Sequence, residues 1–329
     1  MSNLQPSLTD AEYGLRRRVT KREEFLMMMD GIIPWDEWTA VIRPCYYDGK
    51  KGRKPVRLET ILRMYLLQVW FNLSDEAVED QVNDSFAMRQ FMGLDFAVEQ
   101  VPDATTLLRF RHLMEAHGLG KALFDAQNRY FEQRGWIMRG GSVVDATIIA
   151  APSSVKNQDK TRDPEAHQTR KGRQWYFGFK THVGVDAGTG YAHTVTVTSA
   201  NVADIDQTTA LVRADDEVVY ADAGYQGIGK RADVLDDAHL AGVDFRVAAR
   251  KSTLARLPQC DQRLASRQAS VRAKVEHVFL VVKRDFGWAK TRYRGVVKNL
   301  NAMHMAVASA NLVMRARAQA IEQRLAVAG

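Results

Sequence analysis

Two acidic residues, far apart in the chain, follow or interrupt apolar segments that read as strands. Asp222 comes directly after the apolar run 218–221 and before Gly224, and Asp145 lies within the β-rich stretch 142–150. A carboxylate at the carboxyl edge of a buried strand is costly to desolvate unless a cation or a hydrogen-bond donor meets it. This edge is also where ligands bind in open α/β sheets. Both carboxylates therefore suggest a site that holds cations.

A third acid lies on an expected helix that spans residues 266–287. Arg272, Glu276, Phe279 and Lys283 fall at i, i+4, i+7 and i+11, so one stripe of this helix carries a carboxylate between two cations. If the three carboxylates converge, their oxygen atoms select Mg²⁺ or Mn²⁺. Two such ions, about 3.5–4 Å apart, stabilise in-line displacement at phosphorus. Arg272 and Lys283 would then bind phosphates, Arg272 through two hydrogen bonds.

Each of these residues also has a purely structural interpretation. Asp145 can be a strand residue bonded to a neighbour, and Glu276 can form a helical ion pair with Arg272. Gly224-x4-Gly229-Lys230 is close to a nucleotide-binding P-loop, but Arg231 stands where that motif requires Ser or Thr, so we expect no nucleotide cofactor. His182 and His193 are expected to be hydrogen-bonded strand residues rather than metal ligands.

Charge is distributed unevenly along the chain. Residues 246–298 contain 14 Lys or Arg and 3 Asp or Glu, a local balance of +11 in a chain whose formal charge is +7, so the remainder carries −4. A basic block in an otherwise acidic protein indicates a polyanionic partner, although a solvated basic face is an alternative.

The composition is that of a globular protein large enough for two domains. The chain has 329 residues, 46% of them hydrophobic and 26% charged. No apolar run approaches the roughly 20 residues of a membrane helix, and Met1–Asp10 lacks a signal-peptide core, so we expect a cytoplasmic location without membrane association. The two cysteines, Cys45 and Cys260, sit in no ligand-spaced motif, which argues against a zinc site or a disulfide framework.

The first 130 residues predict short helices with tight connections. Ser74 and Asp103 can cap two of them, and such an arrangement suits a helix-turn-helix-like module. In that interpretation the helix after Asp103 faces DNA; the alternative is an all-α packing or dimerisation domain. Its DNA-facing residues would be Thr105, Thr106, Arg109 and Arg111.

Beyond Gly140 the pattern becomes mixed α/β. Residues 179–198 predict a β-hairpin with a glycine-rich turn, and residues 299–325 predict a final amphipathic helix. The polar segment 153–174 predicts a mobile loop that is either filler or a DNA clamp. The clamp residues would be Lys156, Lys160, Arg162, Arg170, Lys171 and Arg173. The candidates for stacking on a DNA base, or alternatively for core packing, are Trp175, Tyr176 and Trp288.

Together these motifs resemble the DDE transposases of the insertion-sequence-five family of bacterial mobile elements. The matching segments are Val143-Val-Asp145-Ala-Thr-Ile-Ile-Ala-Ala-Pro, residues 174–186, Tyr220-Ala-Asp222-Ala-Gly-Tyr, Arg272-x3-Glu276-x6-Lys283 and Tyr293-Arg-Gly295. The resemblance covers nearly the whole chain. One departure is Ala269, where the family often has a tyrosine three residues before the arginine. This departure bears on a base-stacking or DNA-positioning contact and leaves the metal ligands unaffected.

The resemblance implies an α/β fold with an RNase H-like core, namely a mixed five-stranded sheet flanked by helices. Residues 1–135 would form an all-α domain for DNA binding and dimerisation, and residues 136–329 the catalytic domain with a C-terminal helix. Asp145, Asp222 and Glu276 would be the catalytic metal ligands for two Mg²⁺ or Mn²⁺ ions. We expect further DNA contacts from Arg292 and Arg294.

The resemblance also implies a reaction and its partners. The enzyme would bind the terminal inverted repeats of an insertion sequence, free their 3′-hydroxyl ends and transfer them into target DNA. A homodimer would bring the two ends together, because two-fold symmetry matches inverted repeats. The alternatives are a catalytically idle DNA-binding regulator derived from such an enzyme, and an RNase H-like nuclease or resolvase. A bacterial cytoplasmic, nucleoid-associated location would follow.

Overall fold

The computed structural model describes residues 18–47, 49, 54–94, 99–156 and 160–328. The chain forms two compact units. One contains residues 1–113 with 315–329, and the other contains Met114–Met314. The second unit carries the three acidic residues of interest.

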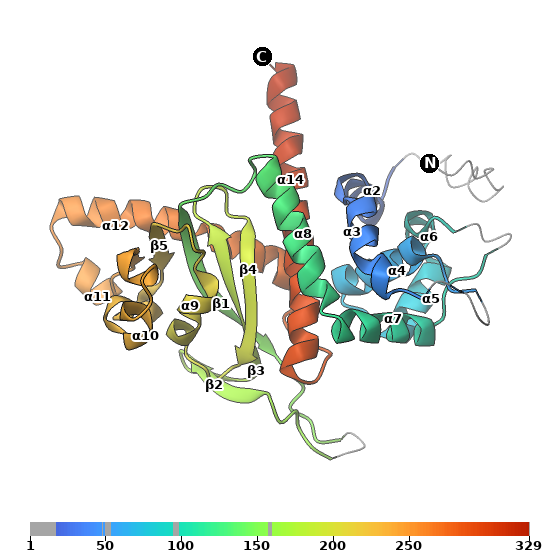
Figure 1. Ribbon diagram of the computed structural model, residues 1–329, viewed down its shortest axis with the longest axis horizontal. Helices are drawn as coiled ribbons and strands as arrows, with labels where there is room; N and C mark the ends of the chain where they lie inside the picture. Colours follow the sequence, from blue (N-terminus) through green and yellow to red (C-terminus); the bar gives the residue numbers. More distant parts are fainter. Residues whose placement is uncertain (1–17, 48, 50–53, 95–98, 157–159, 329) are drawn as a thin grey trace. The chain divides into compact units, whose positions relative to one another are not determined.

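The described part of the first 135 residues is helical, as expected from its periodicity (Figure 1). The Ser74 hydroxyl accepts a hydrogen bond from the Ala77 N–H, and an Asp103 oxygen accepts one from the Thr106 N–H, so both expected N-caps are present. The helices are α2 (Lys21–Ile32), α3 (Trp35–Ile42), α4 (Leu58–Phe71), α5 (Asp75–Asp84), α6 (Phe86–Met92), α7 (Ala104–Ala116) and α8 (Leu119–Gln133).

Helix α7 was expected to turn four polar residues toward DNA, and one of them is placed differently. The Arg111 guanidinium forms an ion pair with Asp75 and also contacts the Gln68 side chain, with only 12% of the Arg111 side chain exposed. A cation that deep requires an internal acid. Arg111 is therefore a structural residue of this unit, and the prediction that it faces DNA is wrong. Thr105 and Arg109 are exposed.

The second unit is built on one mixed sheet, which confirms the expected RNase H-like fold class. β3 is antiparallel to β1 and β4, whereas β5 is parallel to both β1 and β6. The strands are β1 (Gly141–Ala150), β2 (His167–Lys171), β3 (Gln174–Asp186), β4 (Ala192–Ser199), β5 (Val218–Ala221) and β6 (Asp244–Val247). The described residues thus give six strands where five were expected, because β3 extends beyond β4 and its first residues pair with β2.

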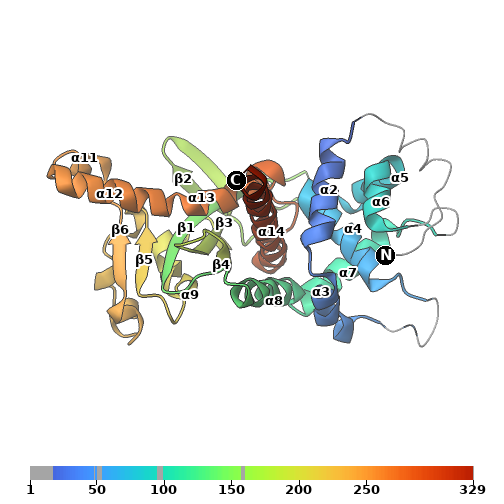
Figure 2. The ribbon, with the colours of Figure 1, turned by 90° about the horizontal axis from the view of Figure 1, so that it is seen from above.

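Helices cover both faces of this sheet. Figure 2 shows α12 (Gln259–Arg272) and α13 (Lys274–Leu280) on one side and α9 (Thr208–Leu211) on the other. On the α9 side, Val144 packs with Leu211 and Tyr225 in a buried cluster. Because successive side chains of a strand point to opposite faces, Asp145 points toward the α12–α13 side.

The described parts of the polar segment 153–174, residues 153–156 and 160–174, are not the mobile loop that the composition predicts; residues 157–159 lie outside the described residues. Part of it forms β2, and two acids in it bind the start of α14 (Val296–Ala328): Asp163 accepts a hydrogen bond from the Gly295 N–H, and Glu165 accepts one from the Val296 N–H. Carboxylates are stabilised at a helix N-terminus, where backbone N–H groups lack partners. Arg294 donates to the carbonyl oxygens of Thr161 and Arg162. The described part of the segment is therefore held by β3 and by the residues at the start of α14.

The expected single helix over 266–287 is interrupted. α12 ends at Arg272, α13 begins at Lys274, and a π-helical turn over Val281–Asp285 follows before Gly287, whose φ is +76°. The Lys274 ammonium group donates hydrogen bonds to the carbonyl oxygens of Ala187 and Gly188 in the β3–β4 turn. These two hydrogen bonds attach the first residue of α13 to the β3–β4 turn, directly after the break between α12 and α13.

The long helix α14 contributes much of the core of the second unit. Its residues 301–313 are buried, and the Asn311 side chain bonds both the N–H and the carbonyl of Ala192 at the start of β4. The Gly120 N–H donates to the Asn301 side chain, and a Cβ at position 120 would lie 2.4 Å from that side chain, so only glycine fits there. None of the described helices is sufficiently long and apolar to span a bilayer.

Candidate active site

Asp145 lies on β1, and Asp222 directly follows the neighbouring parallel strand β5. β1 and β5 pair in the register Gly141 with Val218 through Val144 with Ala221, and the next step of that register puts Asp145 opposite Asp222. Adjacent strands are about 4.8 Å apart, and residues in register share a face. Two acids separated by 76 intervening residues in the sequence thereby come to one edge of the sheet.

Each of these two carboxylates is oriented by a local backbone bond. An Asp145 oxygen accepts a hydrogen bond of 2.7 Å from the Ala146 N–H, and an Asp222 oxygen accepts one of 2.7 Å from the Gly224 N–H. The second bond makes Asp222 the N-cap of a 3₁₀ turn over Ala223–Tyr225. A Cβ at position 224 would lie 2.9 Å from the Asp222 oxygen, so a larger residue there would displace this carboxylate.

The third acid, Glu276, is in the first turn of α13, which packs on β1 and β3. Its charge is felt at Asp145. Burial, together with the charges of Asp222 and Glu276, raises the pKa of the Asp145 carboxyl to about 7, and the Ala146 N–H and the Arg272 guanidinium oppose this rise. The four charged side chains therefore form one electrostatic cluster, although they come from four separate elements or turns.

The two expected phosphate-binding cations lie on either side of Glu276 along the chain. Arg272 is half-buried at the end of α12, and its Nε has no hydrogen-bond partner in the described part of the chain. Lys283 is half-buried in the π-helical turn. Burial lowers the pKa of Lys283; the nearby Lys171 lowers it further, and Glu276 opposes this shift. Lys171 of β2 is thus close enough to this site to act on Lys283.

The preformed arrangement is not a closed metal cage. Among the residues that the structure describes, no three Asp, Glu, His or Cys side chains stand close enough together to hold a metal ion. The site brings the three acids into electrostatic contact without bringing their oxygens to a common point. A metal ion held by all three acids would therefore require their side chains to move.

A buried polar cluster next to Asp222 was not assigned a role from the sequence. Tyr225 is fully buried; its hydroxyl finds no hydrogen-bond partner among the described residues, and burial raises its pKa, with Asp204, Asp145 and Asp222 adding to the rise. Asp204 forms a 2.9 Å ion pair with Lys180. Tyr225 was visible in the Asp222-Ala-Gly-Tyr motif, but nothing in the sequence showed that Asp204 would pack against it.

His182 and His193 are hydrogen-bonded strand residues, as expected; His182 is buried and His193 is half-buried. The His182 Nε2 bonds the Thr198 hydroxyl at 2.8 Å, and burial lowers the pKa of His182 to about 4. The His193 Nε2 bonds the Ser142 hydroxyl at 2.8 Å, and burial lowers the pKa of His193 to about 3. Both imidazoles are neutral near pH 7.

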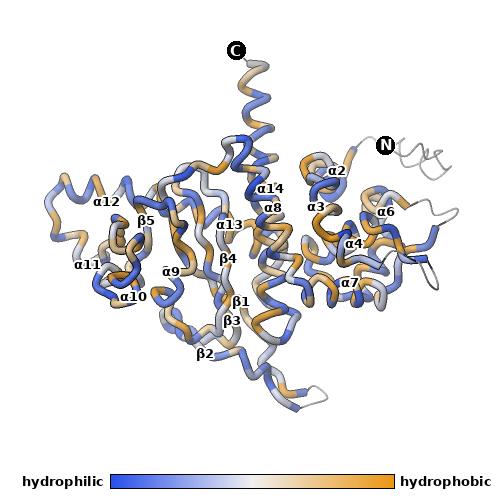
Figure 3. Tube along the Cα trace, viewed as in Figure 1, coloured by the Kyte–Doolittle hydropathy of each residue, from blue (hydrophilic) through white to orange (hydrophobic). Residues whose placement is uncertain are grey.

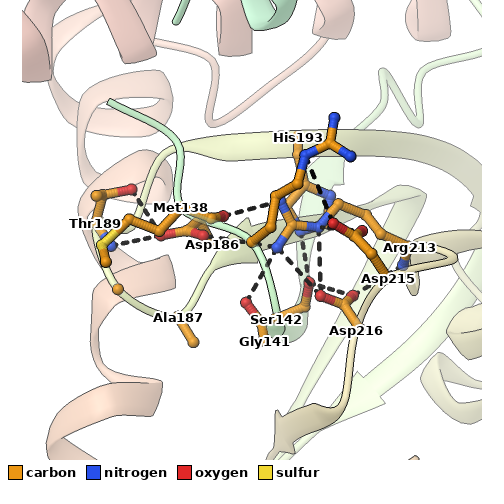
Figure 4. A network of polar contacts seen from close by, with 12 residues as sticks. Met138, Gly141, Ser142, Asp186, Ala187, Thr189, His193, Arg213, Asp215 and Asp216 are labelled. Atoms are coloured by element: carbon orange, nitrogen blue, oxygen red, sulfur yellow. Dashed lines mark hydrogen bonds and ion pairs between the residues drawn. The ribbon is translucent and has the colours of Figure 1, made fainter. Parts of the chain in front are cut away.

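The set Ser142, His193 and Asp216 superficially resembles a hydrolase triad (Figure 4). Asp216, however, accepts a hydrogen bond from Ser142 itself at 2.5 Å rather than from the histidine, and Ser142 is completely buried. The hydroxyl is therefore neither activated by the imidazole nor accessible to a substrate. Arg213 neutralises this site, with ion pairs to Asp216 and Asp186. The network joins the ends of β1, β3 and β4 to the turn before β5.

The remaining predicted DNA contacts are scattered over the surface. Lys156, Arg170 and Arg292 are exposed, and Arg294 is engaged with the segment at Thr161 as described above. Trp175 is 63% exposed on the β2–β3 hairpin, whereas Trp288 is 1% exposed and packs against Tyr293. Trp288 is thus a core residue, which corrects its nomination as a base-stacking candidate. The roles of the exposed residues in DNA binding stay predictions.

Comparison with known proteins gives two family matches and one similar solved structure. Residues 136–312 match the family described as "Transposase DDE domain", and residues 14–113 match the "Transposase domain (DUF772)". A cryo-EM structure of the piggyBac transposase synaptic complex with hairpin DNA aligns with a TM-score of 0.44 and 9% sequence identity, covering 91% of this chain and 75% of that chain. The first match spans more than half of the sequence, and the chain therefore belongs to the DDE-domain transposases.

Proposed function

We propose that this chain is a divalent-metal-dependent DNA transposase of the insertion-sequence-five type, with Asp145, Asp222 and Glu276 as its catalytic carboxylates. The observation that carries the proposal is the electrostatic cluster on one face of the sheet: a half-buried Asp145 whose pKa is raised to about 7, with two further acids acting on it. Such uncompensated carboxylates are costly to ionise unless a cation joins them.

The donor set fits a hard divalent cation. All three groups are carboxylates, and oxygen ligands suit Mg²⁺ or Mn²⁺. When bound, one or two such ions would polarise the scissile phosphodiester and lower the pKa of an attacking water or hydroxyl. Closing of the Glu276 side chain toward the strand edge would complete the ligand set, because Glu276 is exposed and has a flexible side chain.

The chain's own cations would hold the substrate. Arg272 has a buried Nε without a partner in the described structure, so it can donate to a phosphate oxygen at little cost to internal contacts. Lys283 and Lys171 lie near enough to each other to repel, and a phosphate between them would relieve that repulsion. These residues would orient the phosphodiester over the carboxylates and balance the charge that develops in displacement.

The rest of the proposed reaction follows from the same assignment. The enzyme would act on the terminal inverted repeats of an insertion sequence, release 3′-hydroxyl ends and join them to target DNA, as a homodimer at the paired ends. Thr105 and Arg109 on α7 would contribute to DNA recognition, and Lys156, Arg170, Arg292 and Arg294 to backbone binding.

The test is cleavage and joining of duplex DNA that contains the two ends flanking this gene, with Mg²⁺, Mn²⁺, Ca²⁺ or a chelator. We expect nicking at the ends and joined products with Mg²⁺ or Mn²⁺ only, and none with Asp222→Asn. The matched control is Asp233→Asn, because Asp233 is exposed and pairs only with Arg231 in the described structure. Equal inactivity of wild type and Asp222→Asn on correct ends would favour a DNA-binding regulator, and nicks without joining would favour a nuclease.

A further inference from the structure

Helix α12 has no buried residue over its 14 positions, although it leads directly into the catalytic cluster. It extends from α13 past the β6 edge of the sheet (Figure 2), and it is largely hydrophilic (Figure 3). A helix that is polar all round gains little from packing, so its stability is expected to depend on a partner or on ion pairs along its surface.

The helix nevertheless has two distinct faces. Ala265, Gln268, Val271 and Arg272 are half-buried and lie on one side, toward β1 and β5. The opposite side carries Arg263, Ser266, Arg267 and Ser270, which are all exposed and fall at i, i+3, i+4 and i+7. We call these four residues the outer face of α12.

The outer face is cationic and has no internal counter-charge. Neither Arg263 nor Arg267 forms an ion pair or a side-chain hydrogen bond with any described residue, and the one acid of the helix, Asp261, lies off this face. Other arginines of the same unit are paired with acids, as in Arg231 with Asp233 and Arg246 with Asp244. Two neighbouring unpaired arginines flanked by two hydroxyls form a row of donors suited to phosphate oxygens.

We infer that the outer face of α12 binds the sugar–phosphate backbone of duplex DNA a few base pairs from the scissile phosphate. This inference rests on the proposed function, because it takes the scissile phosphate to lie at Glu276. Ala273, between α12 and α13, keeps right-handed helical dihedral angles, so a rise of about 1.5 Å per residue puts Arg267 and Arg263 roughly 14 and 20 Å along the chain from Glu276. At about 3.4 Å per base pair, that distance corresponds to roughly four to six base pairs.

The contact is independent of base sequence. Arginine and serine on an exposed helix face, without an aromatic or amide side chain between them, match phosphates rather than base edges. α12 thus has two tasks on opposite sides: its inner face delivers Arg272 to the carboxylate cluster, and its outer face holds the duplex that leads to that cluster. The surface differs from α7, whose role would be recognition of the element's ends.

The experiment measures the salt dependence of DNA binding in the full-length chain. Arg263→Gln and Arg267→Gln, singly and together, are compared with wild type on an end duplex that extends ten base pairs to each side of the cleavage site. We expect the slope of log Kobs against log salt to fall by about one for each arginine removed. Arg263→Lys with Arg267→Lys restores the slope, because the slope reports charge. Arg129→Gln, an exposed arginine on α8, is the control for a general change in net charge.

Shortened duplexes locate the contact. Duplexes are shortened to three base pairs on one side of the cleavage site at a time. On the side that α12 contacts, this shortening should abolish the difference in salt-dependence slope between wild type and the double variant. A slope equal to that of wild type, or a difference that survives shortening on both sides, overturns the inference. Failure of the proposed function looks different: wild type then neither nicks nor joins the ends, whatever the slopes of the α12 variants are.

Discussion

Two acidic clusters lie on opposite faces of the same strand, β1. They differ in whether a cation of the chain pairs with their carboxylates. On one face Asp216 and Asp186 are buried, but Arg213 pairs with both, and Ser142 donates to Asp216 (Figure 4). On the other face Asp145 has Asp222 and Glu276 as neighbours, and burial together with these charges raises its pKa to about 7.

The difference is one of charge balance within the chain. The Arg213 cluster satisfies its own carboxylates, so it needs nothing from outside and serves to join strand ends. The Asp145 cluster retains repulsion that Arg272 does not remove, and a fold keeps such an arrangement where a ligand completes it. Acid count alone does not separate the two clusters; the presence of an internal cation with good geometry does.

The largest expected effect is loss of catalysis when an acid of the Asp145 cluster is replaced. Asp145→Asn or Glu276→Gln should reduce end cleavage by at least about a thousandfold, because several kcal/mol of transition-state stabilisation depend on these ligands. Binding of end DNA should persist, since the change removes negative charge. Single-turnover cleavage and gel-shift assays measure the two quantities on the same preparation. Loss of end binding in both variants would mean that these acids support the fold instead.

Substitutions in the Arg213 cluster should lower the stability of the protein and not its catalytic rate. Arg213→Gln leaves Asp216 and Asp186 buried without their cation and should lower the free energy of unfolding by about 3–5 kcal/mol. Arg231→Gln breaks exposed ion pairs and should cost less than about 1 kcal/mol. Urea denaturation gives both values. If Arg213→Gln is as stable as Arg231→Gln, the network of Figure 4 is not structural.

The sequence predicted the elements of the Asp145 cluster because each of its acids ends or interrupts a recognisable pattern. Asp222 follows a short apolar strand, Asp145 sits in a β-rich run, and Arg272 and Lys283 share helical spacing with Glu276. The mixed sheet with its helical N-terminal region is confirmed. These features depend on local periodicity and on the order of strands along the chain, which sequence patterns report well.

What the sequence did not show depends on contacts between distant residues. The polar segment 153–174 looked unstructured because its stabilising partners, the N–H groups at the start of α14, are about 130 residues away. Arg111 looked like a DNA contact because its partner Asp75 lies on another helix. In both cases an ordinary polar residue acquires a structural role through a distant complementary charge or helix end, and local composition contains no record of that partner.

The raised pKa of Asp145 predicts a pH-dependent stability with a definite sign. The folded chain retains this proton up to about pH 7, whereas the unfolded chain loses it near pH 4, so the free energy of unfolding of the metal-free protein falls as pH rises between those values. Asp145→Asn should therefore stabilise the chelator-treated protein at pH 8, by on the order of 1–2 kcal/mol after allowance for solvent screening, and change little at pH 4.

Thermal or urea unfolding of wild type and Asp145→Asn across this pH range, in a chelator, measures the effect. Asp216→Asn is the matched comparison from the other cluster and should destabilise at pH 8, because it removes a partner of Arg213. A metal titration adds an independent readout: affinity should rise with pH up to about 7 and then level off, since the ligand must lose its proton. Equal responses of the two Asn variants would erase the distinction between the clusters.

The smallest expected effect concerns how far the Asp145 cluster extends toward β2. Burial lowers the pKa of Lys283, Lys171 lowers it further, and Glu276 opposes the shift. Lys171→Gln should therefore raise the pKa of Lys283, and Glu276→Gln should lower it, whereas the neighbouring Arg170→Gln should have the smaller effect of a more distant exposed charge. NMR titration of isotope-labelled lysine side chains measures these shifts directly. Lys171 and Glu276 act on the pKa of Lys283 with opposite signs. Opposite pKa shifts in the two variants would show that β2 lies at the Asp145 cluster, and identical shifts would show that it does not.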